Sequence, residues 1–98
     1  MHARMTTFAP EPHKIDKLIK ATEEVALPTL EKQKGFKNLL YLTNRHTNEC
    51  IAIVLWDTKA DMTAGEARGF YLLDMLLKAV PFETKPPTRE DYEVSIQG

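Results

Sequence analysis

The sequence lacks the features that would direct it to a membrane, to nucleic acid or to an oxidising compartment. Its only cysteine is Cys50, so no disulfide can form within the chain, which fits a reducing cytosol. Thirteen Lys and Arg residues are balanced by fourteen Asp and Glu residues, so there is no excess positive charge to hold a polyanion. No apolar run reaches the roughly 20 residues that cross a bilayer, and the first residues lack the apolar segment of a signal peptide. We therefore expect a soluble, cytoplasmic protein that binds neither membranes nor nucleic acids.

The sequence is also without the local motifs of several enzyme classes. It contains no Gly-rich phosphate loop and no nucleophile elbow. The only local group of metal-ligating residue types is His46, Glu49 and Cys50. Metal ligands must converge from fixed elements, and this group spans a predicted turn and the start of a strand. We therefore expect neither a metal site nor a cofactor.

Patterns of helix and strand alternate regularly along the chain. An amphipathic helix is predicted from His13, with its apolar residues on one face, and Pro28 should kink or restart it. A second helix opens at the capping residue Thr58 and runs to about Lys78. Two glycines in its middle predict a break, followed by a firmer helix from Arg68 onward. Strands are predicted over residues 3–8, 36–43, 49–57 and 91–97.

The order of these elements is β-α-β-β-α-β over a single domain, residues 1–98. This order predicts an α+β, ferredoxin-like fold, in which a four-stranded antiparallel sheet carries both helices on one face. RNA-recognition domains share the order, but they place a basic and aromatic motif on the third strand. The third strand here, CIAIVLW, has no such motif, so RNA binding is not expected.

The third strand is apolar on both of its faces. One face should carry the alternate residues from Cys50 to Trp56, and the other should carry the three residues between them. A second apolar face must be covered, and the chain has no third helix for the purpose. We therefore predict a homodimer whose sheets pack face to face; the alternative is a central strand with modest exposure. The predicted interface residues are Ile51, Ile53, Leu55, Leu39 and Tyr41.

Three segments together resemble one protein family. GFKNLLYL at residues 35–42, LWDT at 55–58 and PPTREDYEVSI at 86–96 are similar to the antibiotic biosynthesis monooxygenase-like domains, which are dimeric α+β barrels. The resemblance covers nearly the whole chain. Members include cofactor-free monooxygenases of aromatic polyketides and quinols, haem-degrading enzymes, and proteins without assigned chemistry. In the enzymes the pocket lies between the sheet and the helices, and Trp56 matches a tryptophan that lines it in several members.

The sequence departs from the haem-degrading members of that family. Those members resemble each other in an asparagine on the first strand and a haem-ligating histidine on the second helix. Here the first strand carries Arg4, Met5, Thr6 and Thr7, and no histidine occurs from residue 47 onward. Haem degradation by that arrangement is therefore not expected.

Four candidates for a substrate pocket lie at or after the third strand. The indole N–H of Trp56 could donate to a substrate oxygen, although core packing is an equally good reason for a tryptophan there. Arg68, Phe70 and Tyr71 lie where the second helix is predicted to restart. Arg68 could hold an anionic oxygen and Tyr71 could donate or relay a proton, while surface exposure and packing are the commoner roles of these residue types.

Arg4 and Thr6 complete the candidate set, because they share one face of the first strand. That face lines either the pocket or the dimer interface, and the sequence leaves both open. Two functional hypotheses follow. The first is a cofactor-independent monooxygenase acting on a small aromatic or quinol-like substrate. The second is a homodimer of the same fold that binds a small hydrophobic or aromatic molecule without reacting with it, or that is purely structural.

Overall fold

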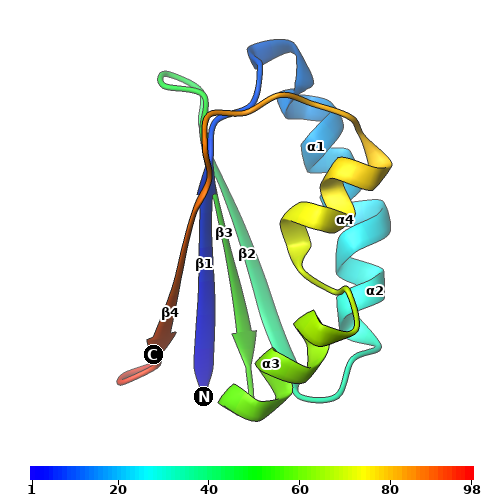
Figure 1. Cartoon of the computed structure of the whole chain (residues 1–98). Helices are drawn as coiled ribbons and strands as arrows, with labels where there is room; N and C mark the ends of the chain where they lie inside the picture. The colour runs from blue at the N-terminus through cyan, green and yellow to red at the C-terminus, as the bar shows by residue number, and fades with distance from the viewer.

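The computed structural model describes all residues, Met1–Gly98. Four strands form one antiparallel sheet in the order β2-β3-β1-β4, as expected for a ferredoxin-like fold (Figure 1). The elements in chain order are β1 (His2–Phe8), η1 (Pro12–Lys14), α1 (Ile15–Ala21), η2 (Thr22–Ala26), α2 (Leu27–Glu31), β2 (Phe36–Asn44), β3 (Glu49–Trp56), α3 (Lys59–Ala67), α4 (Leu72–Ala79) and β4 (Thr88–Glu93).

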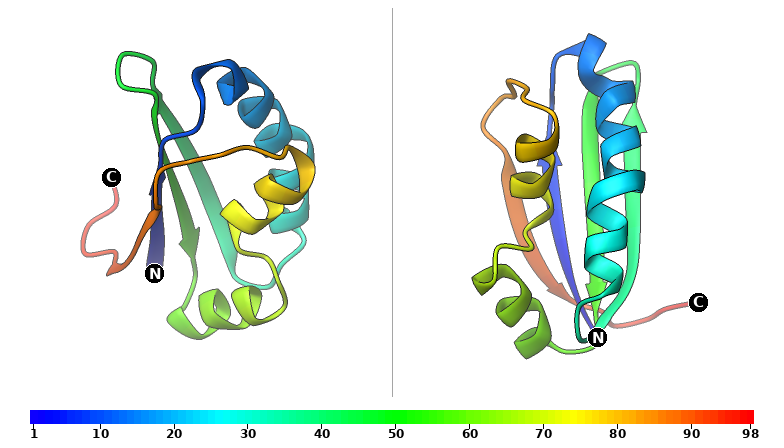
Figure 2. Two further views of the ribbon diagram at one scale, coloured as in Figure 1. Left: turned by 45° about the horizontal axis from the view of Figure 1, so that its top comes forward. Right: turned by 90° about the vertical axis from the view of Figure 1, so that its right-hand side faces the viewer.

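All helices lie on one face of the sheet, and the other face is uncovered (Figures 1 and 2). The α1–η2–α2 helix lies along the β2 side of the sheet, while α3 and α4 lie beside it toward β1 and β4 (Figure 2). This two-layer arrangement confirms the predicted fold class. None of the helices combines the length and apolar character that a bilayer-spanning helix requires.

Pro28 affects the first helix in a specific way. It lies at the start of α2, directly after the η2 segment, in which the helix widens to π-type turns. Because proline has no N–H to donate to the carbonyl four residues earlier, the preceding turn loses one bond, and a π-bulge accommodates the loss. The predicted interruption is therefore a widened turn inside one continuous helical path.

The second helix begins as predicted but restarts later than predicted. The side-chain oxygen of Thr58 accepts a hydrogen bond from the N–H of Asp61 at 3.0 Å, which confirms the predicted cap of α3. The predicted restart at Arg68 is wrong, since α4 begins at Leu72. Gly69 has a φ of +87° and turns the chain out of the helix, so the segment from Arg68 to Tyr71 is a linker.

The last strand lies earlier in the chain than the predicted range 91–97. β4 pairs antiparallel with β1, with Asp91 opposite Arg4 and Arg89 opposite Thr6. The last bond on this side runs from the N–H of Val94 to the carbonyl of Met1, at 2.9 Å. β4 ends at Glu93, so the alternating residues that follow it up to Ile96 lie outside the strand.

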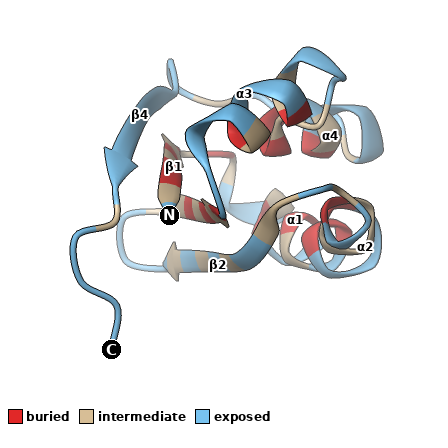
Figure 3. Cartoon of the chain, turned by 90° about the horizontal axis from the view of Figure 1, so that it is seen from below, coloured by how far each residue is buried: buried red, intermediate tan, exposed pale blue.

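The two faces of β3 have the predicted orientation. The alternate residues from Cys50 to Trp56 are all buried under the helices, and Ile51, Ile53 and Leu55 are half-buried on the uncovered face. Figure 3 shows that buried residues gather between the sheet and the helices.

The predicted orientation of β2 is wrong by one residue. Leu39 and Tyr41 pack against the core, so they cannot lie on the uncovered face as predicted interface residues. Leu40 and Leu42 lie on that face instead, each 47% exposed. The physical reason is an irregularity between Phe36 and Asn38, where the pairing of β2 with β3 shifts by one residue.

Candidate functional site

The indole ring of Trp56 lies between the sheet and α3. Trp56 is the last residue of β3 and is 2% exposed, and its ring meets Phe36 edge-on at a centroid distance of 6.1 Å. On the other side it contacts Gly65 of α3. A Cβ at Gly65 would lie 2.9 Å from Cη2 of the indole ring, so this glycine allows the helix to approach the ring closely.

A pocket adjoins this ring, between the sheet and the α3–α4 segment. It contains every predicted pocket residue except Arg68, which is exposed at the end of α3. The free volume is only about 10 Å³, which is about the space of one water molecule. Side chains therefore fill the pocket in this conformation. Its lining residues are Arg4, Thr6, Val54, Trp56, Glu66, Phe70, Tyr71 and Leu72.

One end of the pocket is charged. Arg4 faces the helices, which settles the orientation of β1, and it is only 6% exposed. It forms ion pairs with Glu66 of α3 and with Asp91 of β4. Its Nη2 donates a hydrogen bond to Oδ2 of Asp91 at 3.0 Å. The buried guanidinium is thus held by carboxylates from two different elements, as a buried charge requires.

Hydroxyl groups and a second arginine complete that end. The side-chain oxygens of Thr6 and Tyr71 lie 3.2 Å apart, at hydrogen-bond distance. Arg89 donates from Nη2 to Oε2 of Glu66 at 2.7 Å. The guanidinium carbon of Arg89 also lies 4.7 Å from the centroid of the Tyr71 ring, within the range of a cation–π interaction.

The rest of the pocket lining is apolar and aromatic. Val54, Trp56, Phe70 and Leu72 supply the side chains there. An apolar wall with a few convergent polar groups is the usual build of a small-molecule site. Chemically, the arrangement places an indole ring in the same pocket as a buried cation and hydroxyl groups that could stabilise an anionic oxygen.

The sequence reasoning missed three charged residues of this site, Glu66, Arg89 and Asp91. Arg89 and Asp91 alternate in TREDYE, so both point to the same face of β4. Placing the last strand three residues too late hid this signal. Glu66 lay in the predicted helix, but only its contact with Arg4 identifies it as part of the pocket.

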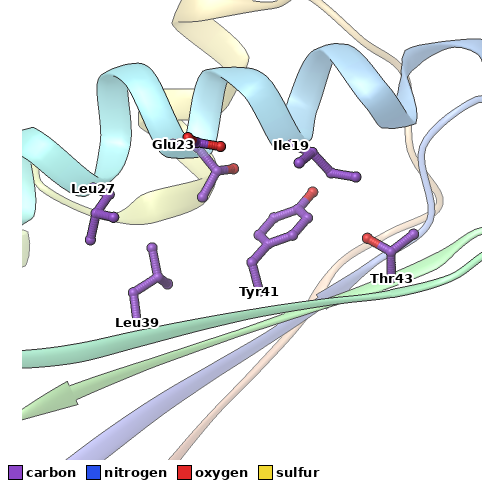
Figure 4. A pocket seen from close by; sticks show the side chains of 7 residues that line it. Ile19, Glu23, Leu27, Leu39, Tyr41 and Thr43 are labelled. Carbon is purple, nitrogen blue, oxygen red and sulfur yellow. The ribbon is translucent and has the colours of Figure 1, made fainter.

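A second hollow lies at the β2 edge of the sheet. It has a volume of about 340 Å³ and runs between the first helix and β2 (Figure 4). In Figure 4, Tyr41 and Leu39 extend from β2 toward the helix. Its lining residues are Ile19, Thr22, Glu23, Leu27, Leu39, Tyr41 and Thr43.

The hydroxyl group of Tyr41 is buried without a hydrogen-bond partner. Burial, and secondarily the nearby Cys50, raises the pKa of Tyr41, while the Thr22 hydroxyl opposes the shift. The hydroxyl of Thr22 itself donates to the carbonyl of Leu18 at 2.7 Å. Tyr41 is therefore held as the neutral phenol, in a place where its hydroxyl contributes no bond.

We predict that Tyr41→Phe raises the free energy of unfolding at neutral pH by about 1 kcal/mol, because it removes a buried polar group without orphaning another. The folded-state pKa of Tyr41 is raised. The stability that comes from keeping this phenol neutral is thus fully present below the unfolded pKa of about 10, and it is lost as the pH rises from there through the raised folded-state pKa. Urea titrations at neutral and alkaline pH should show a smaller alkaline loss in Tyr41→Phe. A destabilised variant at neutral pH would contradict the prediction.

The sequence matches no protein-family model and no curated protein. Solved structures, in contrast, match over nearly the full chain. One is a Nitrosomonas europaea protein named after the antibiotic biosynthesis monooxygenases, with a TM-score of 0.76, 14% identity, and coverage of 98% of this chain and 100% of that one. Another is SnoaB, a cofactor-independent oxygenase from Streptomyces nogalater, with a TM-score of 0.70, 14% identity, and coverage of 98% and 94%.

A third match is a haem degrader from Mycobacterium tuberculosis with two haems bound in its active site. Its TM-score is 0.76, its identity is 13%, and the match covers 100% of this chain and 99% of that chain. At such identities the likeness concerns the backbone fold. The chain therefore has the fold of the antibiotic biosynthesis monooxygenase structures, as its sequence segments suggested.

Proposed function

We propose, from this fold and this pocket, that the protein is a cofactor-independent monooxygenase acting on a small aromatic or quinol-like molecule. One observation carries the proposal: Trp56, Arg4 and the Thr6–Tyr71 hydroxyl pair converge on one pocket from β3, β1 and the α3–α4 linker. The similarity to a cofactor-independent oxygenase supports the reaction type.

The chemistry requires a substrate that can itself reduce oxygen. A quinol does so once a hydroxyl group is ionised, because the resulting oxyanion raises the electron density of the ring. One oxygen atom of O₂ then forms a bond to a ring carbon, and the other leaves as water with the two hydrogens that the substrate loses. The substrate supplies all the electrons and ends as a hydroxyquinone.

The residues of the pocket fit this sequence of events. The ring of the substrate would lie against Trp56, whose indole N–H could donate to a substrate oxygen. Arg4 would stabilise the oxyanion, and the Tyr71 hydroxyl would donate a hydrogen bond to it. Phe70 and Leu72 would exclude water from the reacting carbon. Because the pocket is nearly filled in this structure, a substrate would enter by displacing side chains of the α3–α4 segment.

We propose in addition that the protein is a homodimer. The uncovered face of the sheet carries Leu40, Leu42, Ile51, Ile53 and Leu55, which are exposed or half-buried. These side chains come from adjacent positions of β2 and β3, where Leu40 pairs with Ile53 and Leu42 with Ile51. A contiguous apolar surface of this kind favours association, and face-to-face packing of two sheets would cover it.

The alternative is a protein that binds a small aromatic molecule without reacting with it. It is favoured by the state of the two carboxylates, because Glu66 and Asp91 are both engaged in ion pairs, which makes them poor bases. In this reading the same residues bind and orient the ligand, and oxygen plays no part.

We expect oxygen consumption when the protein is mixed with a panel of quinols and hydroxynaphthalenes, measured with an oxygen electrode after metals have been removed by chelation. Arg4→Gln should lower the rate by about 100-fold, by loss of oxyanion stabilisation. Arg68→Gln makes the same charge change outside the pocket and should retain the rate. Saturable quenching of Trp56 fluorescence without oxygen uptake would favour the alternative. A shifted Soret band on addition of haemin would point instead to haem binding.

A further inference from the structure

Glu66 is placed where it blocks the charged end of the Trp56 pocket. It is the one acidic residue in the pocket lining, and its side chain is 16% exposed. Its carboxylate faces Arg4, which is buried at the inner end. With Glu66 in place, the pocket has room for about one water molecule.

The guanidinium of Arg4 has two distinct sides. The carboxylate of Asp91 accepts hydrogen bonds from Nε and Nη2 on one side. Glu66 takes the remaining nitrogen, Nη1. If the side chain of Glu66 moved away, Arg4 would keep its pairing with Asp91 and would present Nη1 to the pocket. A guanidinium with a free N–H of this kind binds a carboxylate or phenolate oxygen well.

Glu66 also has a second cation to hold it after such a move. Arg89 donates to its other oxygen at 2.7 Å, and its side chain is 47% exposed. Glu66 could therefore leave Arg4 without becoming an unpaired charge. Arg4, Arg89, Glu66 and Asp91 together carry two positive and two negative charges, so the closed cluster is balanced without a ligand.

We propose that the carboxylate of Glu66 occupies the place of the anionic oxygen of the ligand, and that the pocket selects aromatic oxyanions, meaning arene carboxylates and phenolates. This inference rests on the proposed use of the Trp56 pocket as the ligand site. The ligand oxyanion displaces Glu66 from Arg4 and accepts from its Nη1. The Tyr71 hydroxyl, which lines the same pocket, donates a further hydrogen bond, while the ring of the ligand stacks on Trp56.

The displacement fits the small free volume of the pocket. A buried arginine with a free N–H would be unfavourable in an apolar pocket, and Glu66 removes that cost until an anion arrives. The same exchange gives selectivity, since a neutral ligand that displaces Glu66 leaves Nη1 without an anion. Neutral analogues of the same shape should therefore bind more weakly.

The test is isothermal titration calorimetry with 1-naphthoate and with its neutral analogue 1-naphthamide. We expect the wild-type protein to bind the naphthoate more tightly. Glu66→Gln keeps the shape of the side chain but removes the competing charge, so it should bind the naphthoate at least about tenfold more tightly. Its affinity for the naphthamide should change by less than about twofold, on the same scale. Glu90→Gln makes the same charge change at an exposed position of β4 outside the pocket lining and is the matched control.

Three results would overturn the inference. The naphthoate affinity could be unchanged in Glu66→Gln, which would exclude competition. The affinities for both ligands could rise equally in Glu66→Gln, which would mean that the variant only enlarges the pocket. Glu90→Gln could give the same gain, which would mean a general effect of net charge. In the double variant Arg4→Gln/Glu66→Gln, provided that its circular dichroism spectrum is native, the preference for the naphthoate should disappear.

The oxygen electrode separates this inference from the proposed function. If Glu66→Gln binds the naphthoate more tightly but no quinol consumes oxygen, selection of oxyanions holds and the monooxygenase proposal fails. If quinols are turned over while Glu66→Gln leaves the affinity for the naphthoate unchanged, the proposed function holds and the proposed role of Glu66 is wrong.

Discussion

Replacement of Trp56 by alanine is expected to lower the free energy of unfolding by about 3–5 kcal/mol, the usual cost of truncating a buried aromatic side chain. The indole is 2% exposed and is enclosed by Phe36 and by Gly65 of α3. The neighbouring side chains can therefore fill little of the space that the missing indole would leave. A loss of this size is a large part of the stability of an ordinary small domain. Urea unfolding followed by circular dichroism measures it without relying on the missing fluorophore.

Gly65→Ala tests the same contact from the side of the helix. Alanine in place of glycine normally stabilises a helix by about 1 kcal/mol. Here the added methyl group would lie 2.9 Å from Cη2 of Trp56, so we expect a net destabilisation of about 1–3 kcal/mol. In a Trp56→Phe background the ring no longer reaches that position, and Gly65→Ala should become neutral or stabilising. Stabilisation by Gly65→Ala in the wild-type protein would show that the ring does not pack against α3.

The second large effect concerns the uncovered face of the sheet. We expect light scattering to give twice the chain mass of 11.2 kDa for the wild-type protein, because in the proposed dimer a second copy covers the apolar face. Ile53→Glu would place a charge in the centre of that face, where its desolvation opposes association. The dimer should weaken at least about 100-fold, which corresponds to about 2.7 kcal/mol.

Val25→Glu is the matched control for this experiment. Val25 is an apolar residue, 45% exposed, but it belongs to the first helix on the opposite side of the molecule. Introducing the same charge there should leave the mass unchanged. A wild-type protein that scatters as a single chain in dilute neutral buffer would contradict the dimer, and a monomeric Val25→Glu would move the interface to the helices.

Local patterns in the sequence were sufficient for most of the fold. The alternation of CIAIVLW correctly separated Trp56 from Ile53, because a strand has a side-chain period of two whatever surrounds it. The Thr58 cap was visible as well, since it depends only on residues within one helical turn. The order of elements then left few possible topologies.

The errors arose where a distant partner sets the register. The irregularity near Phe36 turned Leu39 and Tyr41 inward, and nothing in their own segment marks it. β4 pairs with β1 over Thr88–Glu93, and the alternation of residues along the sequence does not show where that pairing begins or ends. The break after Gly69 removed Arg68 from the pocket. In each case the outcome depends on hydrogen bonds or contacts between segments that are far apart in the chain.

The sequence by itself determined the ferredoxin-like order and the buried face of β3, because these follow from residue period and local capping. The pocket role of Trp56 was implied only by the resemblance to the antibiotic biosynthesis monooxygenase-like domains. Only the tertiary structure decided that Arg4 faces the helices, that Glu66 lies against it, and that Arg89 and Asp91 complete the cluster. These residues come from β1, α3 and β4. Their charges interact because the fold brings them together in a partly buried place, and no spacing along the chain encodes that distance.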